Sequence, residues 1–228
     1  HILINKYIKS SIQAEDWLAA YDMSQKMALD RSPAKIVKNY YIVAVNLFIS
    51  GEREKALKLL DQLVAARPIK ESRKQTIQVA QRLLDERLFE PSLRLFKPTA
   101  IGASDAEGKN MVLHCAYLCL ELNDTKGFER YMAQAKAIEA DNADSRGALQ
   151  LVLGVQAFQS GYPNQALNHL GNALAEVAPV SGFKQVGLYF NFLIYSNLNS
   201  ETIAQNILAE MSLLFPHGAY TKLLVDEA

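Results

Sequence analysis

The feature of this 228-residue sequence that most constrains its fold is a repeat of 36 to 38 residues. The segments 39–69 and 149–180 show it most clearly. Each reads as an amphipathic helix, a Gly, a second helix with Ala five residues after that Gly, and a closing Pro. With that Ala as the marker of a repeat, six markers follow one another at spacings of 36, 36, 36, 38 and 38 residues: Ala20, Ala56, Ser92, Phe128, Ala166 and Ala204. Such a period indicates an array of two-helix units that bury their apolar faces against their neighbours.

Residues at fixed offsets from the markers support a helix, a tight turn and a second helix in each repeat. Five residues before the markers stand Glu15, Gly51, Arg87, Asn123, Gly161 and Asn199. Four of these six are Gly or Asn, which tolerate the left-handed conformation that ends a helix. Twelve residues before the markers, four of the six side chains are small, which would let paired helices approach closely: Ile8, Ala44, Ala80, Ala116, Gly154 and Phe192. Prolines follow the markers by 12 or 13 residues, where the second helix must stop: Pro33, Pro68, Pro179 and Pro216.

This pattern resembles the tetratricopeptide repeat (TPR) family, with degenerate repeats. The repeats at 37–68 and 147–179 match best, through Ala44, Gly51 and Ala56 in one and Gly154, Gly161 and Ala166 in the other. Phe128 replaces the small residue expected at its marker, and 98–108 reads as a lengthened loop. The resemblance implies an all-α fold, a right-handed α-solenoid of about six TPR-like helical hairpins plus a C-terminal helix. We expect one domain over 1–228, with repeats near 1–33, 37–68, 73–104, 109–140, 147–179 and 185–216, and a last helix at 218–228.

In TPR arrays the first helix of each hairpin lines a concave groove. The resemblance therefore implies a partner-binding surface made of Tyr41, Val45, Phe48, Ile77, Gln81, Leu113, Tyr117, Leu151, Val155, Phe158, Tyr189 and Leu193. These residues are mostly apolar or aromatic, and the Lys, Asn and Arg clamp by which some family members hold a carboxylate is missing. We therefore expect an apolar or amphipathic partner segment. Two alternatives stay open: the array could bury these residues against itself, or the last helix, around Leu223, Leu224 and Val225, could fill the groove.

Charge and composition exclude several classes of protein. Lys+Arg and Asp+Glu are equal at 24 each, which argues against a nucleic-acid binder. The charges are nevertheless uneven: residues 1–100 carry 17 basic and 11 acidic side chains, and residues 101–228 carry 7 and 13. No apolar run reaches the roughly 18 residues needed to span a bilayer, so we expect no membrane insertion. Cys115 and Cys119 are the only cysteines, which favours a reducing, cytoplasmic location; a processed periplasmic domain without disulfides would look the same.

No group of residues points to catalysis, a cofactor or a metal. The segment 102–110 has five residues between its glycines and lacks the Ser or Thr of a phosphate-binding loop. His114, Cys115 and Cys119 lie where the repeat buries small apolar side chains, and no further ligands complete a metal site. The sequence thus predicts a non-catalytic scaffold or adaptor that binds a protein or peptide. An alternative is a ligand- or peptide-sensing module of a larger signalling or transcription regulator, because the chain begins at His1 rather than Met.

Overall fold

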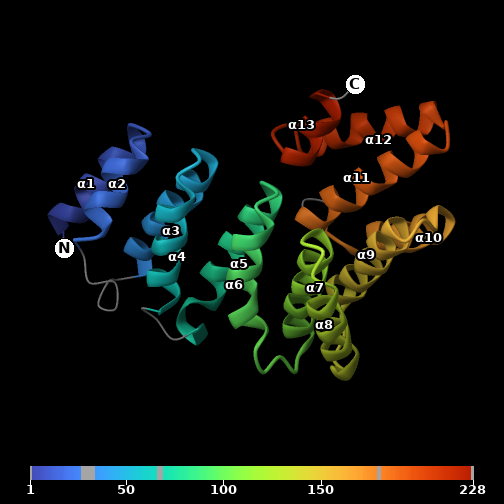
Figure 1. Ribbon diagram of the computed structural model, residues 1–228, viewed down its shortest axis with the longest axis horizontal. Coiled ribbons are helices and arrows are strands. Elements are labelled where there is room, and N and C mark those ends of the chain that lie inside the picture. Colours follow the sequence, from blue (N-terminus) through green and yellow to red (C-terminus); the bar gives the residue numbers. More distant parts are fainter. Residues whose placement is uncertain (1, 27–33, 66–68, 179–180, 227–228) are drawn as a thin grey trace. The chain divides into compact units, whose positions relative to one another are not determined.

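The computed structural model describes residues 2–26, 34–65, 69–178 and 181–226 (Figure 1). These residues form helices and connecting turns, and no strand occurs among them. The chain divides into two compact units, His1–Leu83 and Leu84–Ala228. The boundary between the units falls within the fifth helix, and the expectation of one domain over 1–228 stays a prediction.

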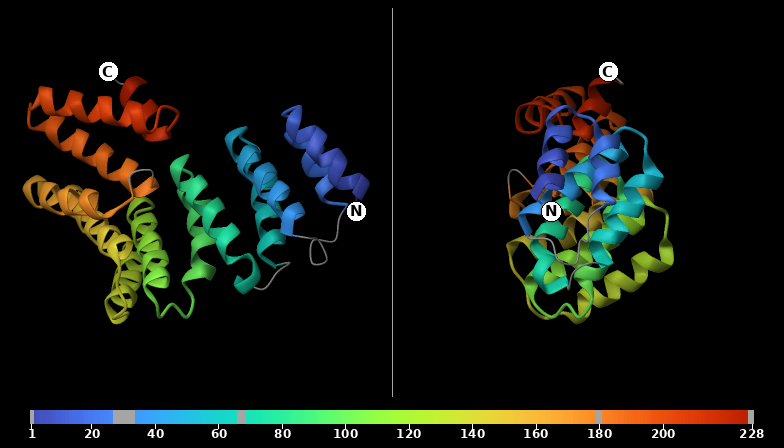
Figure 2. Two further views of the ribbon diagram at one scale, coloured as in Figure 1. Left: turned by 180° about the vertical axis from the view of Figure 1, so that it is seen from behind. Right: turned by 90° about the vertical axis from the view of Figure 1, so that its left-hand side faces the viewer.

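The first unit contains α1 (Ile2–Gln13), α2 (Trp17–Ser24), α3 (Ala34–Ile49), α4 (Arg53–Ala65) and most of α5 (Ile69–Asp85). The second unit contains α6 (Phe89–Ala100), α7 (Ala106–Glu121), α8 (Thr125–Ala137), α9 (Ala143–Gln159), α10 (Pro163–Glu176), α11 (Gly182–Asn197), α12 (Glu201–Leu214) and α13 (Ala219–Asp226). Further views show the antiparallel pairing of α3 with α4, of α7 with α8 and of α11 with α12 (Figure 2). The predicted all-α fold of six helical hairpins plus a C-terminal helix is confirmed over the described residues.

The turn between the two helices of each hairpin has the predicted backbone. All six residues that precede a marker by five have positive φ, from +55° to +85°: Glu15, Gly51, Arg87, Asn123, Gly161 and Asn199. At five of these turns the amide of the following residue donates to a carbonyl of the first helix, as that of Asp124 does to Cys119 at 2.8 Å. This 6→1 bond is the Schellman arrangement that closes a helix and reverses the chain. Of the predicted stop signals, Pro216 follows the end of α12, whereas Pro33, Pro68 and Pro179 lie outside the described residues.

The six markers are all buried on the second helices of the hairpins. Even Phe128, which replaces the expected small residue, is 7% exposed. A small residue on a first helix also allows the close approach of paired helices that the sequence predicts. A Cβ added to Gly154 of α9 would lie 2.8 Å from Cγ of Leu170 in α10, closer than carbon atoms can pack. The close approach of these two helices therefore depends on Gly154.

From α3 onward, the first helices begin three or four residues before the predicted repeat bounds. Polar N-caps explain the difference at three of them, because Asp105, Asn142 and Ser181 each accept a hydrogen bond from a backbone amide in the first turn. The expected loop over 98–108 is shorter in the structure, since α6 continues through Pro98 to Ala100 and α7 begins at Ala106. Pro98 lies in the last turn of α6.

Candidate protein-binding cleft

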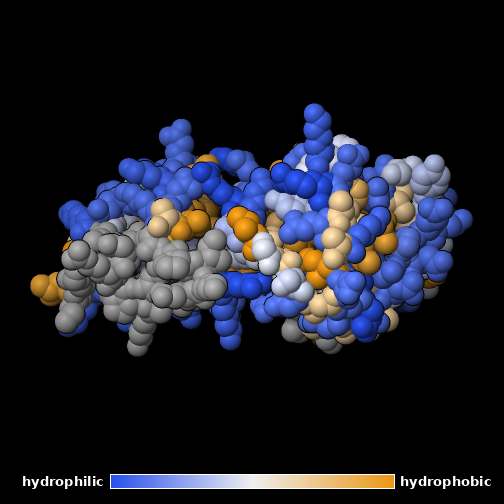
Figure 3. Space-filling view, turned by 90° about the horizontal axis from the view of Figure 1, so that it is seen from below, coloured by the Kyte–Doolittle hydropathy of each residue, from blue (hydrophilic) through white to orange (hydrophobic). Residues whose placement is uncertain are grey.

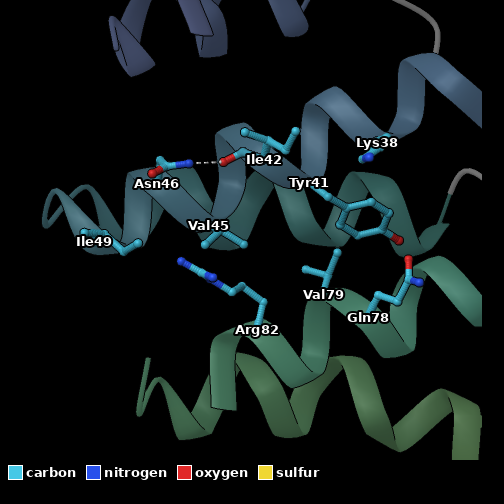
Figure 4. A pocket seen from close by; sticks show the side chains of 9 residues that line it. All are labelled: Lys38, Tyr41, Ile42, Val45, Asn46, Ile49, Gln78, Val79 and Arg82. Atoms are coloured by element: carbon cyan, nitrogen blue, oxygen red, sulfur yellow. Dashed lines mark hydrogen bonds between the residues drawn. The ribbon is translucent and has the colours of Figure 1, made fainter. Parts of the chain in front are cut away.

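The candidate functional site is an open cleft between the first helices of two successive hairpins in the first unit. It has a volume of about 380 Å³ and lies between α3 and α5 (Figure 4). We call it the α3–α5 cleft; nine residues line it: Lys38, Tyr41, Ile42, Val45, Asn46, Ile49, Gln78, Val79 and Arg82. The volume lies within the range of about 300–1,000 Å³ that ligand pockets occupy.

The sequence of α3 explains why apolar side chains face this cleft. Twelve of its sixteen residues are Ala, Val, Ile, Leu, Phe or Tyr, distributed around most of the helix. One side packs into the hairpin core through residues such as Tyr40, Ala44 and Leu47, which are fully buried. The stripe beside it, through Ile42, Val45 and Ile49, has the helical spacing of a second apolar face. Ile49 remains 54% exposed at its end, so this second face is only partly covered.

The cleft has an apolar middle and polar or charged ends. In Figure 4 the Val45 and Val79 side chains lie between α3 and α5, while Lys38 and Gln78 lie at the end near the Tyr41 ring. Asn46 and Ile49 lie at the other end, toward which the Arg82 side chain extends beneath Val45. The amide of Asn46 donates to the carbonyl of Ile42 in the same helix, 2.9 Å away.

A buried hydrogen bond fixes the spacing of the two helices at one end of the cleft. The hydroxyl of Tyr41 on α3 lies 3.2 Å from the hydroxyl of Thr76 on α5, and both residues are buried. A buried hydroxyl pair costs free energy to separate, because each group would lose its partner without regaining water. This hydrogen bond therefore stabilises the separation of α3 and α5 at that end of the cleft.

Of the five predicted partner-binding residues in the first unit, two line the cleft and three do not. Tyr41 and Val45 line the cleft, although only 2% and 7% of their surfaces are exposed. Phe48 and Ile77 are buried and Gln81 is exposed, and none of these three is among the described residues that line the cleft. The residues that line the cleft thus lie about one position further along each helix than the predicted ones. Seven of the nine lining residues were not in the predicted set. The sequence signal that could have indicated the lining residues of α3 is the helical spacing of Ile42, Val45 and Ile49, which forms a second apolar face on α3.

In the second unit, four predicted residues lie in the core. Leu113, Tyr117, Leu151 and Val155 have no exposed surface. These four side chains are therefore not accessible to a partner. In a closely packed array, side chains on the first helices are buried by contacts between hairpins. The other three predicted residues are half-buried: Phe158, Tyr189 and Leu193.

The C-terminal helix α13 covers part of this unit. Its Tyr220 and Leu224 are buried, and the Tyr220 hydroxyl lies 2.8 Å from that of Tyr117 on α7. The Tyr220 ring also packs against Tyr189 of α11, with ring centroids 5.0 Å apart. The alternative in which the last helix fills the predicted surface therefore describes this part of the second unit, although through Tyr220 and Leu224 rather than through the exposed Val225.

A cation lies among the aromatic rings under α13. The Arg87 guanidinium carbon is 5.2 Å from the ring centroid of Tyr220 and 5.7 Å from that of Phe89, within the range of cation–π attraction. Glu121 lies nearby: burial raises the pKa of its carboxyl, and a hydrogen bond from Tyr117 and the charge of Arg87 partly offset that effect. Burial likewise raises the pKa of the Tyr117 hydroxyl well above its usual value. These groups hold α13 in place, and their burial gives them a structural role.

The histidine and the cysteines of α7 are core residues. His114 stacks on Phe183 with ring centroids 4.0 Å apart, and its Nδ1–H donates to the carbonyl of Asn110 at 2.8 Å. Burial lowers the pKa of His114 to about 4, so the ring is neutral at pH 7. Burial raises the pKa of the Cys115 thiol to about 12 and that of Cys119 to about 11, so both remain protonated. The predicted packing of these cysteines in the core is confirmed.

On the face seen in Figure 3, hydrophilic side chains predominate and apolar atoms form separate patches between them. The described part of the chain contains no group of three or more His, Cys, Asp or Glu placed to hold a metal ion. Among the helices described, none is both long enough and apolar enough to cross a membrane.

The repeated left-handed turns and buried markers define the class of the fold: an all-helical, TPR-like array of hairpins with a highly divergent sequence. Neither a protein-family model nor a curated protein sequence matches the chain.

Solved structures with a related arrangement of helices resemble the chain at low sequence identity. PilW, described as a widely conserved type IV pilus biogenesis factor, is 13% identical, with a TM-score of 0.47 over 98% of this chain and 97% of that chain. PilF of Pseudomonas aeruginosa is 9% identical, with a TM-score of 0.43 over 99% and 96%. YrrB, described as a TPR protein with an unusual peptide-binding site, is 13% identical, with a TM-score of 0.37 over 93% and 98%.

Proposed function

We propose that this chain is a non-catalytic protein-interaction scaffold whose α3–α5 cleft binds an apolar or amphipathic segment of a partner protein. The observation that carries the proposal is the open cleft between two first helices, with apolar side chains in its middle and polar ones at its ends. An apolar surface left open to water loses the free energy that burial would give, at about 25 cal/mol per Å². A partner side chain that enters the cleft recovers this free energy.

The position and shape of the cleft favour a peptide segment. Two roughly parallel first helices form a trough into which the apolar side of a helix or an extended segment can lie. Val45 supplies the floor at the middle of the trough and Tyr41 the floor at one end, and Ile42 and Ile49 extend the apolar surface along α3. The proposed contact surface therefore keeps Tyr41 and Val45 from the predicted set and adds the lining residues around them.

A peptide-display selection against the full 228-residue chain tests this proposal. Selected peptides are synthesised, and their affinities are measured for the wild-type chain and for the variant Ile42→Glu/Ile49→Glu. Ile49 is exposed and Ile42 is half-buried, so charged groups here can reach water while they obstruct the cleft. We expect affinity to fall at least about tenfold, because charges would replace apolar contacts within the interface.

The matched control is Ile101→Glu/Leu213→Glu, which places the same two charges at residues 79% and 81% exposed outside the cleft. Circular dichroism establishes that each variant is folded. If the selected peptides bind both variants as tightly as the wild type, the cleft is not the binding surface. A selection that enriches no peptide contradicts the scaffold proposal itself.

A further inference from the structure

We infer that the segment bound in the α3–α5 cleft is an acidic amphipathic helix, with carboxylates on both sides of an apolar stretch. The inference rests on the function proposed above and specifies the chemistry of the partner. It is carried by the charges around the cleft and by their distribution among the helices of the first unit.

The local charges border the apolar middle of the cleft. Among the described residues that line it, Lys38 and Arg82 are cationic and none is acidic. Both side chains are exposed. In Figure 4, Lys38 lies at the end near Tyr41, and Arg82 extends beneath Val45 toward Ile49. A segment lying along the cleft therefore passes one cation, an apolar stretch and a second cation.

The spacing of these features fits two turns of helix. Lys38 and Val45, the residue beside Arg82, are seven positions apart on α3, which corresponds to about 10 Å at 1.5 Å per residue. A partner helix lying along α3 matches this distance with carboxylates at positions i and i+7. Apolar side chains at i+3 and i+4 lie on the same face between them.

The first unit as a whole also carries an excess of positive charge, as the rim of the cleft does. Residues 1–83 hold 14 basic and 8 acidic side chains, a net charge of +6. Up to Leu83, the first helices α1, α3 and α5 carry eight of these basic residues and a single acidic one, Glu71. The second helices α2 and α4 carry three of each sign. The excess positive charge is thus concentrated on the first helices of the hairpins, two of which, α3 and α5, form the cleft.

This arrangement determines which segments are excluded as well as which bind. Positive charge around an apolar trough attracts an acidic segment, accelerates its association and repels a basic segment of equal hydrophobicity. Because Lys38 and Arg82 are exposed at the rim, their effect is screened by salt, whereas the apolar contacts are not. Binding should therefore weaken with ionic strength without disappearing.

Three synthetic peptides test the inference with the full chain. Each is an Ala-rich helix in which two residues, seven positions apart, flank a Leu-Leu pair; these two residues are Glu, Gln or Lys. Affinities are measured by fluorescence anisotropy at low and high salt for the wild type and for Lys38→Glu/Arg82→Glu. The matched control, Lys26→Glu/Lys58→Glu, makes the same change in net charge at exposed residues outside the cleft.

The wild type is expected to bind the Glu peptide about tenfold more tightly than the Gln peptide at low salt, and the Lys peptide weakest. Lys38→Glu/Arg82→Glu should reverse the order of the Glu and Lys peptides, and Lys38→Glu alone should shift it in the same direction. The control variant should keep the wild-type order.

The outcomes separate this inference from the function on which it rests. Equal binding of the Glu and Gln peptides, with both lost in Ile42→Glu/Ile49→Glu, would leave the scaffold in place and overturn the acidic partner. Preference of the wild type for the Lys peptide would overturn it too, as would failure of the Glu peptide to bind while display selection yields neutral or basic peptides. If no designed peptide binds and the selection is also empty, both proposals fail.

Discussion

The phenolic oxygens of Tyr117 and Tyr220 lie 2.8 Å apart and join α7 to the last helix, α13, across 103 residues of sequence. Both rings are buried. Tyr220→Phe should therefore keep the packing and lose one hydrogen bond, lowering the free energy of unfolding of the second unit by about 1 kcal/mol. Tyr220→Ala also leaves a cavity and should cost about 3–5 kcal/mol.

Urea unfolding followed by circular dichroism measures both variants of Tyr220, and hydrogen exchange reports on α13 itself. We expect faster exchange in α13 for Tyr220→Ala than for Tyr220→Phe. Equal and negligible effects of the two substitutions would mean that α13 is not held through Tyr220.

The buried histidine on α7 predicts a pH dependence of stability. The pKa of His114 falls from 6.5 in the unfolded chain to about 4 in the folded one, because burial disfavours the charged ring. The unfolded chain then binds more protons between these values, so stability is fully present above pH 6.5 and is lost as the pH falls toward 4. The loss from this group is about 3 kcal/mol, at 1.36 kcal/mol per pKa unit.

His114→Phe, which retains an aromatic ring beside Phe183, should remove this part of the dependence. Unfolding free energies of the wild type and the variant, measured from pH 7 to pH 4, should diverge by that amount. Replacement of the exposed His217 by Gln is the matched control and should leave the wild-type profile unchanged. Parallel profiles for the wild type and His114→Phe would contradict the buried, neutral state of this ring.

Two helical glycines should respond in opposite directions to the same substitution. Gly154→Ala forces a Cβ against Leu170, including its backbone nitrogen at 3.2 Å, and should destabilise the α9–α10 hairpin by about 1–3 kcal/mol. Gly171→Ala in α10 meets nothing within 4 Å and should stabilise the same hairpin by about 0.5–1 kcal/mol through helix propensity. Thermal unfolding compares them directly, and a shift of the same sign for both would show that α9 and α10 are packed less closely than described.

The turn between α1 and α2 should be improved by glycine. Glu15 has φ of +55°, a conformation that costs free energy for a residue with a Cβ. Glu15→Gly should therefore raise the stability of the first unit by about 0.5–1 kcal/mol, whereas Lys58→Gly inside α4 should lower it by about 1 kcal/mol. Fluorescence of Trp17, the single tryptophan, reports unfolding in this unit. A loss of stability in Glu15→Gly would contradict the left-handed turn.

The hairpins could be predicted from the sequence because their determinants are local. Gly51, Gly161, Asn123 and Asn199 mark turns by residue type, and the constant offset from the markers located the remaining two at Glu15 and Arg87. Neither of those two residues prefers positive φ. The repeat therefore predicted these two turns although their residue types did not, because hairpins in an array share one geometry.

The site could be predicted less well because it depends on how neighbouring hairpins meet. The same repeat position is Val45 in the first unit, which lines an open cleft, and Tyr117 in the second, which α13 covers. A rotation of α3 by one residue exchanges Phe48 for Ile49 as the accessible side chain. The division of the chain into two units also left no local signal, since the boundary falls within a helix that is continuous in sequence.

The most direct test of the account is a methyl NMR titration of the full chain with the Glu peptide, using isotope-labelled Ile and Val. We expect shift changes confined to the cleft methyl groups, those of Ile42, Val45, Ile49 and Val79. The exposed methyl groups of Ile203 and Val225 in the second unit should not shift. Changes centred on the second unit, with the cleft methyl groups unaffected at saturation, would contradict the claim that the α3–α5 cleft is the binding surface.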